Sequence, residues 1–176
     1  IDAFSQTRVK EERTGRFVFD LIDKYVDTSH KTSVIFPANS EQDVNDLKSD
    51  TFKSIVHFKR INNFPFINKF FEVVNSKLPI GGIFITKVET KDLRKKRLMA
   101  KYKPVIREIY YFFDFILKRV FPKMPVTRKI YYLVTKGRNR VLSKTETMGR
   151  LYSCGFKIIE ERYIGNRLYI VCEKVR

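Results

Sequence analysis

Side chains that could do chemistry are thinly spread along this sequence, which contains only two histidines. His57 stands just before Lys59 and Arg60, where a strand is expected to end. Ligands of open α/β sheets bind beyond the carboxyl ends of the strands, so His57 could face a ligand. A lone histidine is also commonly packed inside a protein, and the sequence leaves both interpretations open. His30 lies in a polar break and is expected to be exposed.

The patterns typical of catalytic and cofactor sites are missing from the sequence. No pair of histidines or acids has the spacing of metal ligands. No Ser-His-Asp set or GxSxG motif indicates a hydrolase. The seven glycines form neither a P-loop nor a GxGxxG turn. We therefore predict no catalytic residue, no cofactor-binding residue and no metal-binding residue in this chain.

Positive charge is the most prominent property of the chain, whose formal net charge is +17. Residues 91–144 hold 17 lysines and arginines against three acids, so less than a third of the chain carries most of the excess. Such a segment predicts a polyanionic neighbour, although charge runs are often only solvated surface. The side chains predicted to contact an anion or a membrane are Arg94, Lys95, Lys96, Arg97, Lys118, Arg119, Lys123, Arg128, Lys129, Lys136, Arg138 and Arg140.

Nine aromatic residues are interleaved with these charges between Lys101 and Tyr132. An interfacial helix would place its aromatic face in the headgroup region of an anionic membrane and its basic groups on lipid phosphates. The alternatives are a core helix with a solvated basic face, and stacking on single-stranded RNA. No RNA-recognition motif is present, so nucleic acid is the least favoured partner.

The spacing of apolar residues predicts helices that alternate with strands. The clearest unit is a helix that begins near Ile67 and stops at Pro79, followed by the Gly81-Gly82 turn and a buried strand over 83–88. Ser143 and Glu146 form a capping-box pattern before another helix. Further helices are expected over 11–25, from 91 onward, over 104–121 and over 126–134, and further strands over 32–36, 52–58, 156–162 and 167–174.

This order of elements indicates an α/β fold in one domain. Strands that alternate with helices favour a parallel sheet, to which the closing hairpin adds an antiparallel strand. With 43 % hydrophobic residues, the chain can form a proper core. We expect one domain over 1–176 with a helical, basic-aromatic insertion over 90–142, and we expect the chain to be a fragment of a longer protein.

The two cysteines and the absence of long apolar runs indicate in which part of the cell the protein is expected. Cys154 and Cys172 do not form a CxxC pair, and both stand among apolar residues. Reduced core thiols are typical of cytosolic proteins. No run reaches the ~18 apolar residues of a transmembrane helix, and no signal peptide is visible. We therefore expect a cytoplasmic protein, with peripheral attachment to the cytoplasmic face of the inner membrane as the extension of that prediction.

Two stretches resemble the class I S-adenosylmethionine-dependent methyltransferase fold. The LPIGG turn and the IFITKV strand resemble the turn before the fifth strand of that family and the strand itself. The CGF turn and the closing hairpin resemble the turn and the two-strand hairpin with which the family's fold ends. The resemblance implies a shortened Rossmann-like or methyltransferase-like sheet of about five strands, in the order 1-2-3-5-4 with the last strand antiparallel. The family also has a glycine-rich turn after its first strand, but here TSVIF is followed by PANS without glycine. This implies a cofactor-free version.

The basic segment and its flanks resemble the N-terminal domain that precedes a bacterial sugar transferase in Bacteroides-type polysaccharide-synthesis proteins. That resemblance implies a non-catalytic accessory domain of an enzyme that loads sugar phosphate onto a polyprenyl-phosphate carrier. The implied partners are the sugar-transferase catalytic domain and an anionic membrane surface or lipid phosphate. The alternative is a methyltransferase with an atypical cofactor site and an RNA or glycan substrate.

Overall fold

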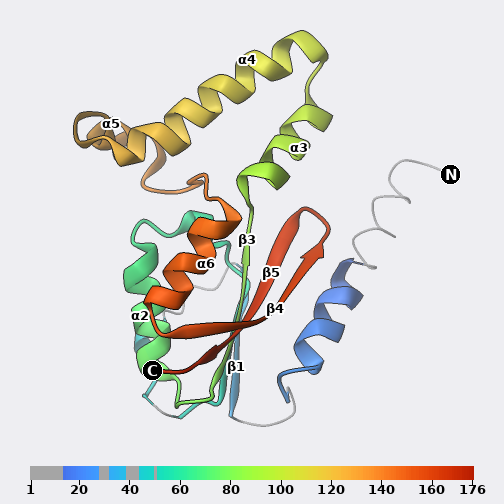
Figure 1. Ribbon diagram of the computed structural model, residues 1–176, viewed down its shortest axis with the longest axis vertical. Coiled ribbons are helices and arrows are strands. Elements are labelled where there is room, and N and C mark those ends of the chain that lie inside the picture. Colours follow the sequence, from blue (N-terminus) through green and yellow to red (C-terminus); the bar gives the residue numbers. More distant parts are fainter. Residues whose placement is uncertain (1–13, 28–31, 39–43, 50) are drawn as a thin grey trace, which may run out of the picture.

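The computed structural model describes residues 14–27, 32–38, 44–49 and 51–176 (Figure 1). Its strands are β1 (Ser33–Phe36), β2 (Ser54–His57), β3 (Ile83–Val88), β4 (Phe156–Ile164) and β5 (Arg167–Lys174). Its main helices are α2 (Ile67–Lys77), α3 (Lys91–Lys101), α4 (Pro104–Phe115), α5 (Pro125–Thr135) and α6 (Lys144–Ser153). Residues 14–23 are also helical. The start of the helix expected over 11–25 and His30 lie outside the described residues.

The five strands form one sheet in the order β1-β2-β3-β5-β4. Strands β1, β2 and β3 are parallel, with Val34 opposite Ile55 and Ile55 opposite Phe84. Strand β5 runs antiparallel to both β3 and β4. It is therefore the one strand of this sheet that runs in the opposite direction to the other four. The predicted α/β fold class, strand order and methyltransferase-like topology are confirmed.

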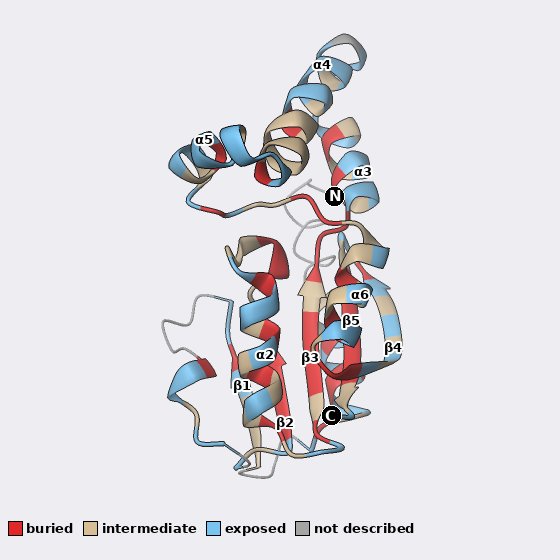
Figure 2. Ribbon diagram, turned by 60° about the vertical axis from the view of Figure 1, so that its left-hand side comes forward, coloured by how far each residue is buried: buried red, intermediate tan, exposed pale blue. Residues whose placement is uncertain are grey.

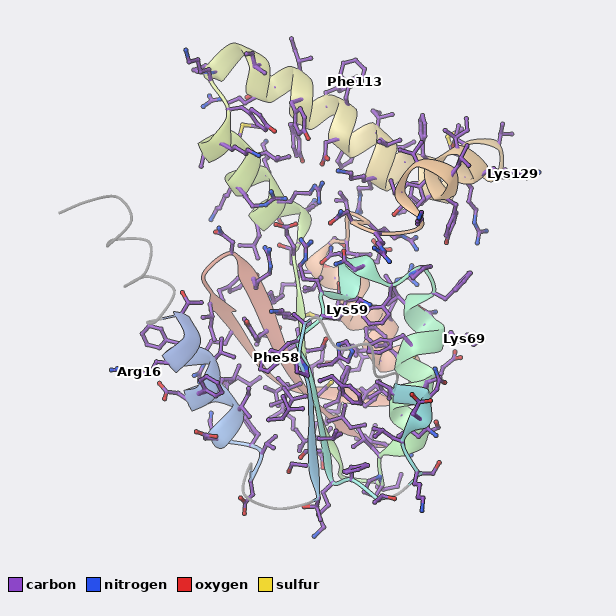
Figure 3. The ribbon with its side chains drawn as sticks, turned by 180° about the vertical axis from the view of Figure 1, so that it is seen from behind. Arg16, Phe58, Lys59, Lys69, Phe113 and Lys129 are labelled. Atoms are coloured by element: carbon purple, nitrogen blue, oxygen red, sulfur yellow. The ribbon has the colours of Figure 1, made fainter. Side chains whose placement is uncertain are left out.

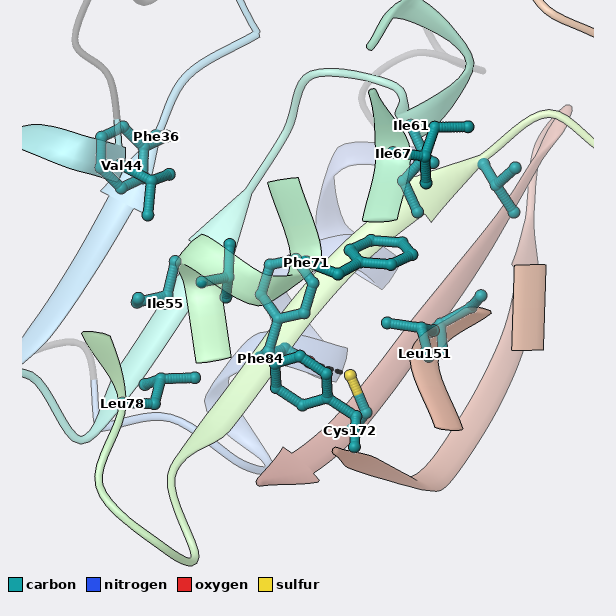
Figure 4. Packing of buried hydrophobic residues seen from close by; sticks show 14 of the residues in the cluster. Phe36, Val44, Ile55, Ile61, Ile67, Phe71, Leu78, Phe84, Leu151 and Cys172 are labelled. Atoms are coloured by element: carbon teal, nitrogen blue, oxygen red, sulfur yellow. Dashed lines mark hydrogen bonds between the residues drawn. The ribbon is translucent and has the colours of Figure 1, made fainter. Parts of the chain in front are cut away.

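Helices cover both faces of this sheet (Figure 1). On one face, α2 and α6 pack through Phe71 and Leu151 onto Phe84 and Cys172, in a cluster that Figure 4 shows closely. On the other face, the helix over 14–23 packs through Leu21 and Ile22 in a second cluster. Figure 2 shows the central strands β2, β3 and β5 as mostly buried, whereas the outer strands β1 and β4 carry exposed positions. A sheet buried on both faces explains why its parallel strands are almost continuously apolar.

The two cysteines are both free thiols in this structure. Cys172 is fully buried, and its thiol donates to the carbonyl oxygen of Phe84 at 3.3 Å. Its burial raises the pKa of that thiol, which keeps it protonated. Cys154 is only partly buried, so of the two expected core thiols only Cys172 lies fully inside.

A helical segment projects beyond the carboxyl ends of β1, β2 and β3 (Figure 1). It consists of α3, α4, a π-helical turn η3 (Ile116–Val120), a 3-10 turn η4 (Phe121–Lys123) and α5. Its two ends meet, because Thr90 pairs with Leu142 in an isolated bridge and Lys91 N–H donates to Leu142 O at 2.8 Å. The segment therefore leaves the α/β body and returns to it at one point.

One predicted helix has a different end in the structure. The sequence predicts a helix over 104–121, whereas α4 ends at Phe115 and continues as the π turn. Pro122 has no N–H to donate to the carbonyl of Lys118, and Val141 N–H donates to that carbonyl instead, at 3.1 Å. A residue distant in sequence thus completes the hydrogen bonding that proline interrupts.

Candidate functional site at the carboxyl edge

The carboxyl ends of β2 and β3 lie at one edge of the sheet, directly beneath the helical segment (Figure 1). Open α/β sheets bind their ligands at this edge. Figure 3 labels Phe58 and Lys59, which follow β2, near this boundary. Lys59 is partly exposed, and its ammonium lies 5.4 Å from the centre of the Phe64 ring. The edge is therefore the first place to look for a site.

His57 does not face a ligand at this edge. Its ring is packed against those of Phe36, Phe64 and Phe70, with centroids 5.5, 5.4 and 5.1 Å away. Only 6 % of the residue is exposed. The structure selects the interior interpretation of this histidine over the ligand-facing one.

Glu89 follows β3 and is the centre of an unusual ion cluster. Its side chain is 0 % exposed. The oxygens lie 2.8 Å from Arg97 Nε, 2.9 Å from Arg167 Nη1, 3.3 Å from Arg60 Nη1 and 3.5 Å from Arg94 Nη1. Four guanidinium groups from α3, β5 and the loop after β2 therefore share one carboxylate.

The cluster carries more positive than negative charge, and the pKa values reflect this. Burial raises the pKa of Glu89, but the Arg97 hydrogen bond and the charges of Arg167, Arg97 and Arg94 lower it below its usual range. Burial lowers the pKa of Lys87 nearby, and the charges of Arg167 and Arg60 lower it further. This edge of the sheet therefore has an excess of cations that an anion would relieve.

A second buried ion pair joins α3 to α4. Arg94 Nε and Nη2 donate to the two carboxylate oxygens of Asp114, at 2.6 and 2.8 Å. Lys118 Nζ also donates to Asp114, at 2.6 Å. Both Arg94 and Asp114 are nearly fully buried. The paired geometry satisfies charges that would otherwise be costly inside a protein.

Asn62 links the strand ends to the point where the helical segment returns. Its amide donates to the carbonyls of Glu89 and Arg140, at 2.9 and 2.8 Å, and its Oδ1 accepts from Glu89 N–H at 2.8 Å. Arg140 N–H donates back to Asn62 O at 2.9 Å. One buried amide therefore fixes the loop after β2 to the end of β3 and to the returning chain.

The twelve basic residues predicted to contact an anion or a membrane do not form one patch. Arg94 is buried in the two ion clusters, so its predicted surface role is corrected to an interior one. Arg97, Lys118 and Arg119 are held in ion pairs with Glu89, Asp114 and Glu146. The others are exposed or partly exposed: Lys95, Lys96, Lys123, Arg128, Lys129, Lys136, Arg138 and Arg140.

Sequence reasoning missed the acid around which the cluster is built. Glu89 stands alone in the sequence between Val88 and Thr90, and its partners Arg60 and Arg167 come from distant segments. Only the sheet order brings the end of β3 next to the start of β5. The one available signal was an acid placed directly after a buried strand.

A basic pocket of about 430 Å³ lies between the start of α2 and the α5 region. It is lined by Lys69, Arg128, Arg140 and Arg150, with Glu72 as the acid and with Tyr132 and Phe66 among its other walls. Arg150 donates to Asn68 and Glu146, at 2.6 and 3.0 Å. Chemically, this hollow suits a phosphate group, because guanidinium groups bind phosphate well.

The described residues do not supply the cofactor cradle that the fold implies. Strand β1 ends at the buried Phe36 and is followed by the exposed Pro37, where the resemblance leads us to expect a glycine turn. At the end of β2, the rings of Phe36 and Phe70 pack against His57, and the acid after β3 is held by arginines. A site for S-adenosylmethionine in this chain would therefore have to be atypical.

The described part of the chain contains neither a metal-binding cluster nor a membrane-spanning helix. No group of three or more histidine, cysteine or acidic side chains is arranged to hold a metal ion within the described residues. Among the helices of the same residues, none combines the length and the apolar character needed to cross a membrane.

Comparison with known proteins identifies similar structures but no family model and no curated relative. No family model matches the chain, and no curated protein matches its sequence. Similar solved structures include PigF with SAH (22 % identity, TM-score 0.47, 76 % of this chain and 34 % of that one). A second is an S-adenosylmethionine-dependent methyltransferase from Mesorhizobium loti (12 % identity, TM-score 0.47, 76 % of this chain and 68 % of that one). A third is the S-adenosylmethionine-dependent methyltransferase from Methanosarcina mazei (14 % identity, TM-score 0.49, 76 % of this chain and 65 % of that one). The chain thus spans about a third to two thirds of these proteins.

These findings contradict the prediction of a non-catalytic accessory domain of a sugar transferase. Two of the structures named above are S-adenosylmethionine-dependent methyltransferases, the third is PigF with SAH, and none of the three is named as a sugar transferase. The error came from giving weight to the basic-aromatic segment, which is a property of an insertion rather than of the sheet. The methyltransferase alternative is the one that agrees with the fold.

Proposed function

We propose that this chain is part of an S-adenosylmethionine-dependent methyltransferase with an atypical cofactor site. The observation that carries the proposal is the sheet order β1-β2-β3-β5-β4, with β5 antiparallel between β3 and β4. The resemblance of the LPIGG and CGF stretches to the class I methyltransferase fold implied this reversed closing strand. Because one fold supports many activities, the proposal depends on a direct test of binding.

The positive charge favours an acceptor that carries phosphate, such as RNA, over a neutral glycan. The basic pocket offers Arg128, Arg140 and Lys69 close to the edge of the sheet. Within the described part of the chain, the side chains of all three form no hydrogen bond or ion pair, and Arg128 lies over the Tyr132 ring. Guanidinium and ammonium groups that form no ion pair suit a phosphate-bearing acceptor, and here they outnumber Glu72, the acid that lines the same pocket.

The first experiment is calorimetric titration of the chain with S-adenosylhomocysteine, the product of methyl transfer. We expect saturable binding, and we expect Lys59→Ala to weaken it roughly tenfold because Lys59 stands at the carboxyl edge beside a partly exposed ring. Lys77→Ala is the matched control, since Lys77 lies in the last turn of α2, at the opposite edge. Absence of binding to the unaltered chain would overturn the proposal.

The acceptor is tested separately with S-adenosylmethionine labelled on its methyl group. We expect label to enter RNA and not a neutral glycan, and we expect Arg140→Ala to reduce this transfer while leaving S-adenosylhomocysteine binding unchanged. Transfer to the glycan alone would keep the enzyme class and overturn the choice of acceptor. This separation distinguishes an error about the substrate from an error about the activity.

A further inference from the structure

Helix α4 turns its apolar side toward solvent. Ile106, Ile109 and Phe113 follow one another at three- and four-residue steps and therefore share a face. Their exposed fractions are 57, 57 and 65 %. The side that faces the protein instead carries Asp114, buried in its pair with Arg94. A surface helix of a soluble protein normally has the reverse orientation.

Helix α5 repeats this inverted arrangement. Val126, Ile130 and Leu133 share one face and are 77, 49 and 83 % exposed. The side directed inward is marked by Tyr131, which is 1 % exposed and whose hydroxyl donates to Arg138 O at 3.0 Å. Two successive helices with the same inversion indicate a surface rather than an isolated exposed side chain.

The helical segment also lacks a hydrophobic core of its own. Over the described side chains of 91–135, the buried apolar residues are Leu98, Pro122 and Tyr131. Polar pairs such as Arg94 with Asp114 fill the interior instead. Removing apolar area from water is the main favourable contribution to the free energy of folding. Covering the exposed faces of α4 and α5 with an apolar partner would therefore be favourable.

Basic side chains surround these apolar faces. Lys101 and Lys103 stand before α4, and Lys123, Arg128 and Lys129 stand around the start of α5; all five are exposed. Figure 3 shows Phe113 and Lys129 directed away from the α/β body. Each exposed apolar face thus has exposed cations close to it along the chain.

We propose that the exposed faces of α4 and α5 dock on the surface of an anionic lipid bilayer. Phe, Ile, Val and Leu side chains would enter the boundary between headgroups and acyl chains, and the cations would lie on lipid phosphates. The contact is interfacial, since none of the described helices can span a bilayer. This inference does not rest on the proposed methyltransferase activity.

Two other occupants fit the same surface less well. Nucleic acid would use the cations and stack on aromatic rings, but it offers nothing to exposed aliphatic chains such as Leu133 and Val126. A second copy would cover the aliphatic chains but would bring together two segments that each carry 17 basic residues against three acids over 91–144. An anionic bilayer matches both the apolar side chains and the charge, whereas each of these two occupants matches only one of them.

The test is co-sedimentation of the full chain with vesicles of phosphatidylcholine, with and without phosphatidylglycerol. We expect binding to the anionic vesicles, weakening as salt rises. Phe113→Ser and Leu133→Ser should each reduce the partition coefficient by about tenfold, the order expected for withdrawing one large apolar side chain. Ile80→Ser is the matched control because Ile80 is 69 % exposed but lies in the turn before β3; it should change nothing.

The charge is tested with Lys129→Glu against Lys157→Glu, an exposed lysine on β4. The first variant should lower the partition coefficient by about fivefold or more and the second should not, because one basic group at a membrane surface contributes about that factor. Absence of binding to anionic vesicles would overturn the proposal. So would equal losses in Phe113→Ser and Ile80→Ser, or self-association in sedimentation that Leu133→Ser abolishes.

Discussion

At the scale of single residues, Glu89 determines how the carboxyl edge is built. It is the one carboxylate shared by Arg60, Arg94, Arg97 and Arg167. Removing one partner from a buried ion cluster leaves the remaining charges uncompensated. The loss of stability is then larger than the net stabilisation that the intact ion pairs provide. The same cluster explains why these arginines can converge on a part of the chain already rich in cations.

Neutralising this carboxylate should destabilise the protein strongly. We expect Glu89→Gln to lower the free energy of unfolding by about 3 kcal/mol at neutral pH, because Arg60, Arg97 and Arg167 lose their countercharge and Arg94 keeps only Asp114. Glu161→Gln, which removes the partner of Lys144 at the exposed side of β4, should cost less than about 1 kcal/mol. Urea unfolding followed by circular dichroism measures both, and equal effects would contradict this account of Glu89.

Glu89 also predicts how the stability of the folded protein depends on pH. The folded pKa of Glu89 lies below its ordinary value of 4.5, since its arginine partners outweigh the effect of burial. A depressed folded pKa gives stability that is fully present above the unfolded pKa and is lost as pH falls through the folded one. The unaltered chain should therefore lose stability steeply below pH 4.5, and Glu89→Gln should show a shallower loss over that range.

At this scale the sequence predicted residue types better than residue roles. The density of lysines and arginines over 91–144 was visible, but their division into buried and exposed groups was not. Arg94 and Lys95 are neighbours in the sequence, yet one is buried against Asp114 and the other is exposed. That division depends on how α3 packs on α4, which local spacing does not encode.

At the scale of elements, periodicity and capping residues predicted most of the structure. The helix α2 and the strand β3 agree with prediction because the LPIGG stretch both ends one and starts the other. Ser143 caps α6 as predicted, its Oγ accepting from Glu146 N–H at 3.0 Å. The π turn that follows α4 was not predicted, because the Lys118 carbonyl in it accepts from Val141 N–H, a contact that no local pattern could indicate.

Two glycines, one inside α6 and one just after it, give predictions of opposite sign. Gly155 has φ +85°, and a Cβ there would lie 2.5 Å from the carbonyl oxygen of Arg176. Gly155→Ala should therefore destabilise the protein by more than about 1 kcal/mol. Gly149, inside α6, has open space around it, so Gly149→Ala should stabilise by about 0.5–1 kcal/mol. Thermal unfolding of both variants checks this, and a shared sign would contradict the local geometry.

At the scale of the whole molecule, the protein has two regions that bury opposite kinds of side chain. The α/β body buries apolar side chains on both faces of its sheet. The helical segment buries ion pairs and exposes its apolar side chains. The sheet order could be predicted because the LPIGG and CGF stretches resemble a known family, and that resemblance implies the order 1-2-3-5-4. The orientation of α4 could not, since an amphipathic pattern shows that a helix has two faces without showing which one meets the protein.

Because the ends of the helical segment meet, the body should fold without it. We expect a chain in which residues 91–141 are replaced by a short Gly-Ser linker between Thr90 and Leu142 to unfold in one cooperative transition. The bridge between those two residues already holds the junction closed. Glu89 keeps Arg60 and Arg167 as partners, so its charge stays compensated.

The same shortened chain also separates the two proposals. It should lose binding to anionic vesicles, because α4 and α5 are gone, and keep binding to S-adenosylhomocysteine, because Lys59 and the strand ends remain. Circular dichroism and calorimetry on one preparation measure both. If the shortened chain fails to fold, adding Glu89→Leu to it asks whether the ion cluster is the cause. Failure of that variant too would mean that the segment supports the body through Asn62 and Arg140, and that the two regions form one cooperative unit.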